Sequence, residues 1–190
     1  MGSESISGDD EGTPYVLLLQ GINVGGHSRL PMTVLRDILT GLGFSQARTY
    51  LQSGNAVVTT SLTAAQVAAA AEKALGEALS RDVGVVVRTA AQLVGVVEHA
   101  PFDPAVDPTT KHVMFLRQAS DAEKLGILPR ETMGSEHYWV SGTHVYLYLP
   151  SGMGRSKLSA WVTRRLAGTG STARNWNTVL ALRDMTSGRR

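Results

Sequence analysis

The chain has 190 residues, a net charge of +2 and no cysteine, which excludes disulfides, thiolate catalysis and cysteine–metal sites. Its length suits one large domain or two small ones, and no apolar run is long enough to cross a membrane. Residues 1–13 are polar and lack the apolar stretch of a signal peptide. We therefore expect a disordered tail at residues 1–13 and a cytoplasmic protein that has no membrane partner.

The charge is distributed unevenly along the chain. Residues 1–110 contain six basic and eleven acidic side chains, whereas residues 111–190 contain twelve basic and five acidic ones. This asymmetry favours an anionic partner for the second half. A mildly basic, solvated surface explains the same charges, because they form no run of like sign.

The first half has the pattern β-α-β-β-α-β. The apolar strand Tyr15–Gln20 is followed by a glycine-rich loop and by a helix that opens at Pro31. The next predicted elements are a hairpin of Arg48–Gln52 and Ala56–Thr60 around Ser53-Gly54-Asn55, an alanine-rich helix from the Thr63 cap to about Ser80, and a strand at Gly84–Arg88.

A bridge at residues 90–110 contains a short helix and a proline-rich linker, and the same element order then repeats. The predicted elements of the second half are a strand at His112–Arg117, a short helix from Ser120 that stops before Pro129, a hairpin of Glu136–Ser141 and His144–Leu149, a helix from Ser156 to about Leu166, a strand at Ser171–Arg174 and a final helix from the Asn175 cap to about Met185.

We predict an α+β fold of two tandem ferredoxin-like units with antiparallel sheets, plus a C-terminal helix. The first unit covers residues 14–89, the bridge residues 90–110 and the second unit residues 111–190. In this topology the loop after the first strand and the hairpin between the second and third strands lie at the same end. Gly21–Arg29 should therefore lie beside Ser53–Asn55.

Several ordered motifs are spread from Tyr15 to Met185. They are L-L-Q-G-I-N-V-G-G-H at Leu18–His27, L-P-M at Leu30–Met32, T-Y-L-Q-S-G-N at Thr49–Asn55, Y-L-P-S-G-M-G-R-S-K-L at Tyr148–Leu158 and T-A-R-N-W-N-T at Thr172–Thr178. They resemble the bacterial family known as domain of unknown function 1697, and the resemblance implies no activity. That family usually has Arg before the first glycine, where this chain has Gln20, so the resemblance implies an amide where a charged anion contact would otherwise lie.

The glycine-rich loop is the first candidate site. It matches neither the Walker A loop nor the G-x-G-x-x-G spacing, but its N–H groups and the following helix could hold a phosphate or carboxylate. The candidate ligand-binding residues are Gly21, Asn23, Gly25, Gly26, His27, Arg29, Ser53 and Asn55. Alternatively, the glycines serve only the positive φ angles of a tight connection.

The second half offers a basic set of candidates for nucleic-acid or anion binding. These are Arg155, Ser156, Lys157, Arg174, Asn175 and Trp176. Arg155 and Lys157 flank a helix N-cap, where cations oppose the helix dipole and a bound anion would relieve the repulsion. Alternatively, both cations extend into water and Trp176 is a packing anchor.

The second hairpin has two faces by strand alternation. We expect the core face to hold Tyr138, Val140, Val145, Leu147 and Leu149. The other face holds His137, Trp139, Ser141, His144, Tyr146 and Tyr148, and such aromatic sheets stack bases in RNA-recognition motifs. The signature string of those motifs is absent, and the alternative is that this face packs against the first unit or a second chain.

Three functions remain open from the sequence. The first is a protein that binds a phosphate-bearing ligand, either nucleic acid or nucleotide. The second is an enzyme for a small anionic substrate, with His27 as acid–base and Arg29 as anchor, and the third is a protein-interaction or homo-oligomer module. The histidines and carboxylates show no metal-ligand spacing and no cofactor fingerprint is present, so we predict neither a metal nor a cofactor and assign no catalytic residue.

Overall fold

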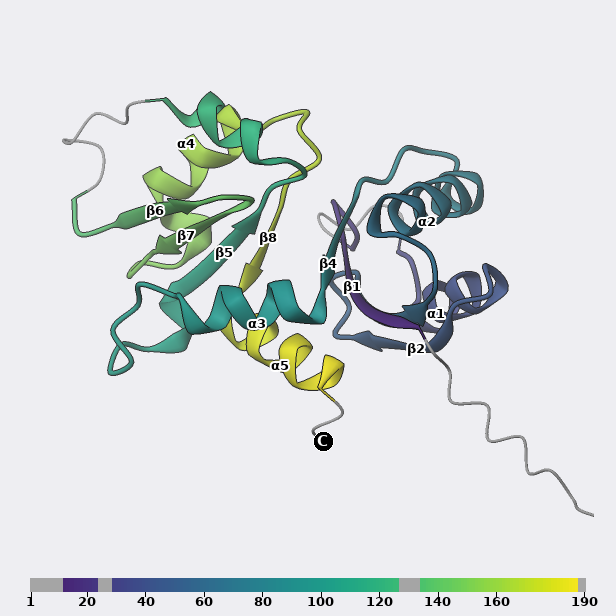
Figure 1. Cartoon of the computed structure of the whole chain (residues 1–190). Helices are drawn as coiled ribbons and strands as arrows, with labels where there is room; N and C mark the ends of the chain where they lie inside the picture. Colours follow the sequence, from purple (N-terminus) through teal and green to yellow (C-terminus); the bar gives the residue numbers. More distant parts are fainter. Residues whose placement is uncertain (1–11, 24–28, 127–133, 188–190) are drawn as a thin grey trace, which may run out of the picture.

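Two four-stranded antiparallel sheets form the framework of this α+β protein (Figure 1). The computed structural model describes residues 12–23, 29–126 and 134–187. The first sheet has the order β2-β3-β1-β4 and the second β6-β7-β5-β8. The strands are β1 (Thr13–Leu19), β2 (Ser45–Tyr50), β3 (Asn55–Thr60), β4 (Val85–Thr89), β5 (Lys111–Phe115), β6 (His137–Ser141), β7 (His144–Tyr148) and β8 (Thr172–Asn175).

The helices follow the predicted order in both halves, with one difference. They are α1 (Met32–Gly41), α2 (Ala64–Leu79), α3 (Ala90–Glu98), α4 (Lys157–Arg165) and α5 (Trp176–Thr186), with the 3-10 turns η1 (Pro108–Thr110), η2 (Ala119–Leu125) and η4 (Met153–Arg155). The helix expected from Ser120 is the 3-10 segment η2. The part of that prediction beyond Gly126 falls outside the described residues, as does most of the expected N-terminal tail.

Strand β1 is apolar on both faces because both faces are covered. Tyr15, Leu17 and Leu19 pack with α1 and α2 in one core, whereas Val16 and Leu18 belong to a second core on the opposite side of the sheet. Pairing with β3 and β4 places the strand inside the sheet, as its continuous hydrophobic run predicts. Figure 1 shows α1 and α2 on the side of this sheet that faces away from the other sheet.

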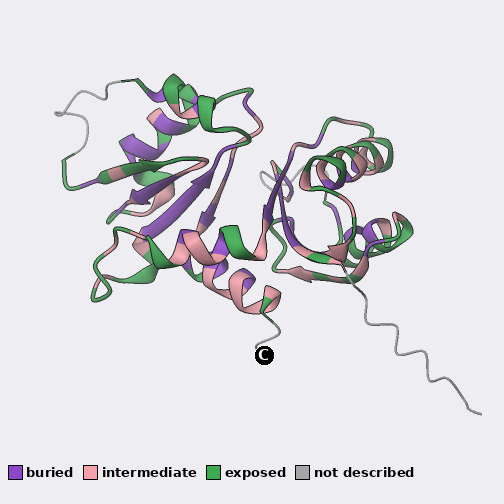
Figure 2. Cartoon of the chain, in the orientation of Figure 1, coloured by how far each residue is buried: buried purple, intermediate pink, exposed green. Residues whose placement is uncertain are grey.

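The second core joins the two halves of the chain. It combines Val16, Leu18, Val57 and Val86 of the first sheet with Val113, Phe115 and Tyr146 of the second, and it also contains buried residues of α3 and α5. These two helices lie side by side below the sheets (Figure 1), and Figure 2 shows the buried strands that face this shared core. The outer face of the second sheet packs separately against α4.

The hairpin of β6 and β7 has the expected register, since Ser141 pairs with His144. Two residues do not follow the simple two-face prediction. Val140 was expected in the core but is 47% exposed, and it lies on β6, the edge strand of the second sheet. Tyr146, on the expected polar face, is buried in the shared core and donates a hydrogen bond to the Val96 carbonyl of α3 at 2.7 Å.

The aromatic hairpin face is therefore divided. Tyr146 on β7 packs into the core shared with the first sheet and contacts α3, as the packing alternative predicted. Its cross-strand neighbour Trp139, on the edge strand β6, remains 38% exposed. A continuous base-stacking platform is not available on this face.

Candidate functional site

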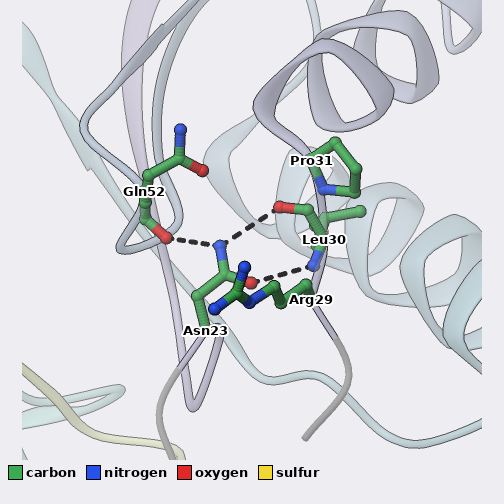
Figure 3. A pocket seen from close by; sticks show the side chains of 5 residues that line it. All are labelled: Asn23, Arg29, Leu30, Pro31 and Gln52. Carbon is green, nitrogen blue, oxygen red and sulfur yellow. Dashed lines mark hydrogen bonds between the residues drawn. The ribbon is translucent and has the colours of Figure 1, made fainter. Parts of the chain in front are cut away.

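The side chain of Asn23 closes the base of the glycine-rich loop (Figure 3). Its Nδ2 donates to the Leu30 carbonyl at 3.1 Å, and its Oδ1 accepts from the Leu30 N–H at 2.9 Å. The same Nδ2 donates to the Gln52 carbonyl of the β2–β3 turn. Asn23 has a φ of 57°, a left-handed conformation that Asn tolerates. It thus joins Leu30 to the β2–β3 turn, and this contact agrees with the proximity that the topology predicted.

The neighbouring hairpin is held by Asn55, which is fully buried. Asn55 Nδ2 donates to the Tyr50 carbonyl and to the Ser53 hydroxyl, both at 2.9 Å. Ser53 itself is exposed. A Cβ at Gly54 would lie 2.9 Å from the Leu19 Cβ, and Gly54 has a φ of 73°, so this turn requires glycine.

A pocket of about 520 Å³ lies beside these two turns. It is lined by Asn23, Arg29, Leu30, Pro31 and Gln52, and Figure 3 shows them around the opening. None of these lining residues is acidic. The volume falls in the range of pockets that hold small molecules.

Helix α1 opens onto this pocket without a side-chain cap. Its N-cap residue is Pro31, which has no side-chain hydrogen bond, and the first turn contains no acidic residue. The first N–H groups of a helix lack intrahelical partners and carry partial positive charge. Together with the exposed guanidinium of Arg29, this N-terminus makes the pocket electropositive.

The other predicted loop residues are placed only in part. Gly21 has a φ of 62° and its carbonyl accepts from Arg81 Nη2 at 3.1 Å, so its role fits the conformational alternative. Gly25, Gly26 and His27 lie outside the described residues, and the acid–base role of His27 stays a prediction.

The N-terminus of α4 already has a carboxylate of the protein itself, that of Glu136, as a hydrogen-bond acceptor, and the sequence did not indicate this contact. Ser156 Oγ accepts from the Ser159 N–H at 2.8 Å, and Glu136 Oε2 accepts from the Leu158 N–H at 3.0 Å. Glu136 is 9% exposed, and its carboxylate supplies the negative charge that the helix dipole favours. Arg155 and Lys157 extend from exposed positions.

Arg174 is buried and engaged with the protein on every side. It is 7% exposed, and burial lowers its pKa to about 10, so it remains charged at neutral pH. Its guanidinium donates to Asn55 Oδ1, Thr172 Oγ1 and the carbonyls of Ala173, Leu19 and Gly54. Arg174 therefore connects the second sheet to the first hairpin and has no N–H left for a ligand.

The two residues after Arg174 also have structural partners. Asn175 Oδ1 accepts from the Asn177 N–H at 2.9 Å and caps α5. Trp176 is 9% exposed and packs edge-to-face with Phe102, with a centroid distance of 5.2 Å. It is a packing anchor, as the alternative prediction stated.

The structure thus brings Asn23, Arg29, Ser53 and Asn55 to one end of the first sheet. Of the basic candidates, Arg174 reaches this end through its contact with Asn55, whereas Arg155, Ser156 and Lys157 lie at the start of α4. Gln52 and Pro31, which line the pocket, were not among the predicted site residues. Gln52 belongs to the motif T-Y-L-Q-S-G-N and Pro31 to the motif L-P-M. Their place in these motifs was the sequence feature that could have identified them as site residues.

Two general searches of the described part of the chain were negative. No helix there is long and apolar enough to cross a membrane. No group of three or more His, Asp or Glu side chains in these residues is arranged to hold a metal ion.

Comparisons with known proteins place the fold in a family. No curated protein matches the sequence. The solved structure of the conserved bacterial protein SP0830 from Streptococcus pneumoniae is 20% identical, has a TM-score of 0.77 and covers 93% of this chain and 99% of its own, a likeness that shows the fold alone. The family model described as protein of unknown function (DUF1697) matches residues 13–146. This match and the motifs show that the chain belongs to the DUF1697 family.

Proposed function

We propose that the protein binds a small phosphate-bearing ligand, of the nucleotide class, in the pocket beside the glycine-rich loop. The observation that carries this proposal is the uncapped N-terminus of α1, which opens on a pocket that has Arg29 and no acidic residue among its described lining residues. Backbone N–H groups at a helix start, paired with a nearby guanidinium, form a common arrangement for phosphate binding.

A mononucleotide suits the proposal better than a long nucleic acid. The pocket of about 520 Å³ is compact, whereas Trp176 and Tyr146, which could have stacked successive bases, are buried in the shared core. Arg174 is fully engaged by protein acceptors. The positively charged, aromatic path that single strands require is therefore interrupted.

We also propose that the chain is built of two ferredoxin-like units, residues 14–89 and 111–190, joined by the bridge at residues 90–110. The proposed binding site lies in the first unit. The strand orders β2-β3-β1-β4 and β6-β7-β5-β8 support this architecture, because both equal the order of the split β-α-β arrangement. Helices α1 and α2 on one face of the first sheet support it as well.

The proposal is tested by calorimetric titration of the full chain with nucleoside monophosphates and with inorganic phosphate. We expect Arg29→Gln to weaken binding about tenfold or more, since a charge-assisted hydrogen bond is lost. The matched control is Arg36→Gln, because Arg36 is exposed on α1 but does not line the pocket; it should bind as the wild type does. Binding of single-stranded oligonucleotides without any binding of mononucleotides or phosphate would contradict the proposal.

A further inference from the structure

Two arginines occupy equivalent positions in the two halves. Arg88 is the next-to-last residue of β4, and Arg174 is the next-to-last residue of β8. Each is followed by the N-cap residue of a helix, α3 after Arg88 and α5 after Arg174. Each side chain crosses to the opposite sheet. Arg88 and Arg174 are therefore related by the internal repeat of the fold.

The acceptors of the two arginines are equivalent as well. Arg88 Nη2 donates to the carbonyls of Leu116 and Thr143, at 2.6 and 2.8 Å. Arg174 Nη2 donates to the carbonyls of Leu19 and Gly54, at 2.8 and 3.2 Å. In both halves the first acceptor residue follows or ends the central strand and the second lies in the turn of the hairpin, and the two are themselves hydrogen bonded.

The repeat breaks at the residue after each turn. In the first half this residue is Asn55, whose Oδ1 accepts from Arg174 Nε. In the second half it is His144, and neither Arg88 Nε nor His144 Nε2 has a hydrogen-bond partner among the described residues, although both atoms are buried. A buried polar group without a partner is destabilising, and most such groups in native proteins have one.

A pocket of about 210 Å³ lies at the point where the repeat breaks. Arg88 and His144 line it together with Gln92 and His99 of the α3 region and Ser141 of the hairpin. The lining residues are donors or neutral groups, with no carboxylate among them. Arg88 is only 6% exposed, and no ion pair to it is present in the described part of the chain.

We propose that this pocket is a binding site for a small oxyanion, the carboxylate or phosphoryl group of a ligand that fits between α3 and the β6–β7 hairpin. A bound oxyanion supplies the counter-charge that Arg88 lacks and an acceptor for the Arg88 guanidinium, whose Nε–H has no partner among the described residues. It performs in the second half the role that the Asn55 amide oxygen performs in the first. The site is separate from the pocket beside the glycine-rich loop and does not depend on the function proposed there.

The state of the two side chains fits this role. Burial and the charge of Arg88 lower the pKa of His144 to about 4, so the imidazole is neutral at pH 7 and one of its nitrogens can donate. Burial lowers the pKa of Arg88 to about 10, so the guanidinium keeps its charge. One cation and one neutral donor match a single oxyanion group.

The test uses the full chain carrying Arg29→Gln, so that phosphate does not report on the other pocket. Acetate and inorganic phosphate are titrated separately, and the side-chain nitrogen signals of His144 are followed by NMR. We expect a saturable shift of the His144 signals with at least one probe, and the responding probe identifies the group as carboxylate or phosphoryl.

The decisive variant is His144→Asn, which places at this position the residue of the first half. It should close the pocket, raise the melting temperature and weaken probe binding at least tenfold, with binding by the variants measured by calorimetric titration because His144→Asn lacks the reporter imidazole. His137→Asn, an exposed neighbour on the same hairpin, should leave the melting temperature and the binding unchanged. Ser141→Val tests the lining without changing the arginine or the histidine and should also weaken binding. No saturable shift with either probe, or equal binding by His144→Asn, would overturn the proposal.

Discussion

Polar side chains that the sequence presents as ligand candidates serve here as partners for the protein's own backbone. The Asn23 amide pairs with both backbone groups of Leu30, and Asn55 spans its own turn. A side-chain amide both donates and accepts hydrogen bonds, so an Asn in a glycine-rich loop can pair with the backbone of the loop as readily as with a ligand. The sequence pattern is the same whether the Asn has a structural or a ligand-binding role.

His144 makes the stability of the protein depend on pH. Its pKa is lowered from 6.5 to about 4 by burial and by the charge of Arg88. Between these values the unfolded chain binds a proton that the folded chain excludes, so the free energy of unfolding should fall as the pH falls through this window. The loss from this histidine is at most about 3–4 kcal/mol, and solvent screening makes it smaller because the imidazole is only partly buried.

Urea unfolding at several pH values between about 7 and 4 measures this effect. His144→Asn should lose less stability over the window than the wild type, because carboxylates contribute equally to both. His137→Asn provides the control, since its histidine is exposed and should follow the wild type. Parallel pH curves for the wild type and His144→Asn would show that His144 is not responsible.

At the scale of elements, helix starts are read well from the sequence when the cap is local. Thr63 and Thr89 form capping boxes with the residues three positions later, and Asn175 caps α5. Helix α4 also uses a distant group, because the Glu136 carboxylate that reaches its N-terminus comes from the start of the hairpin. The sequence predicted the cap at Ser156 but not this second partner.

Replacement of Glu136 by Gln tests the electrostatic part of that contact. The amide oxygen can still accept from the Leu158 N–H, but the charge near the helix N-terminus is lost, so we expect a decrease of about 1 kcal/mol in the free energy of unfolding. Chemical denaturation followed by circular dichroism measures it. Glu123→Gln, at an exposed position, should have little effect, and an equal loss in both variants would contradict the assignment.

At the scale of the whole molecule, the two halves are joined by a shared core and by buried polar contacts across it. Both sheets contribute residues to the core that contains α3 and α5. Arg88 and Arg174 each reach backbone carbonyls of the opposite half, and Arg117 pairs with Glu72 of α2 at 2.7 Å. We therefore expect the two halves to unfold together rather than as separate domains.

Arg174→Met tests this coupling. The variant removes the buried hydrogen bonds that the Asn55 side-chain oxygen and the carbonyls of Leu19 and Gly54 accept from the guanidinium, so we expect a loss of about 3 kcal/mol in the free energy of unfolding. Fluorescence and circular dichroism should still report one transition. Arg183→Met, which removes a partly exposed pair with Asp184, should cost far less, and separate transitions for the two probes would contradict the shared-core account.

The sequence by itself determined the features that depend on near neighbours. Alternation and apolar runs gave the strands, capping residues gave most helix starts, and the motifs gave the family that the match to residues 13–146 confirms. The order of elements also placed the glycine-rich loop beside the Ser53–Asn55 turn, since strand directions follow from chain order.

Only the tertiary structure decided which polar side chains already have hydrogen-bond partners within the protein. Arg174 and Asn55 are 119 positions apart, and Arg88 and Thr143 are 55 apart, so no periodicity links them. Whether an arginine is free for a ligand depends on the carbonyls that surround it in the folded chain, and those come from the opposite sheet. For the same reason, the sequence could not distinguish the closed Arg174–Asn55 contact from the open pocket at Arg88 and His144.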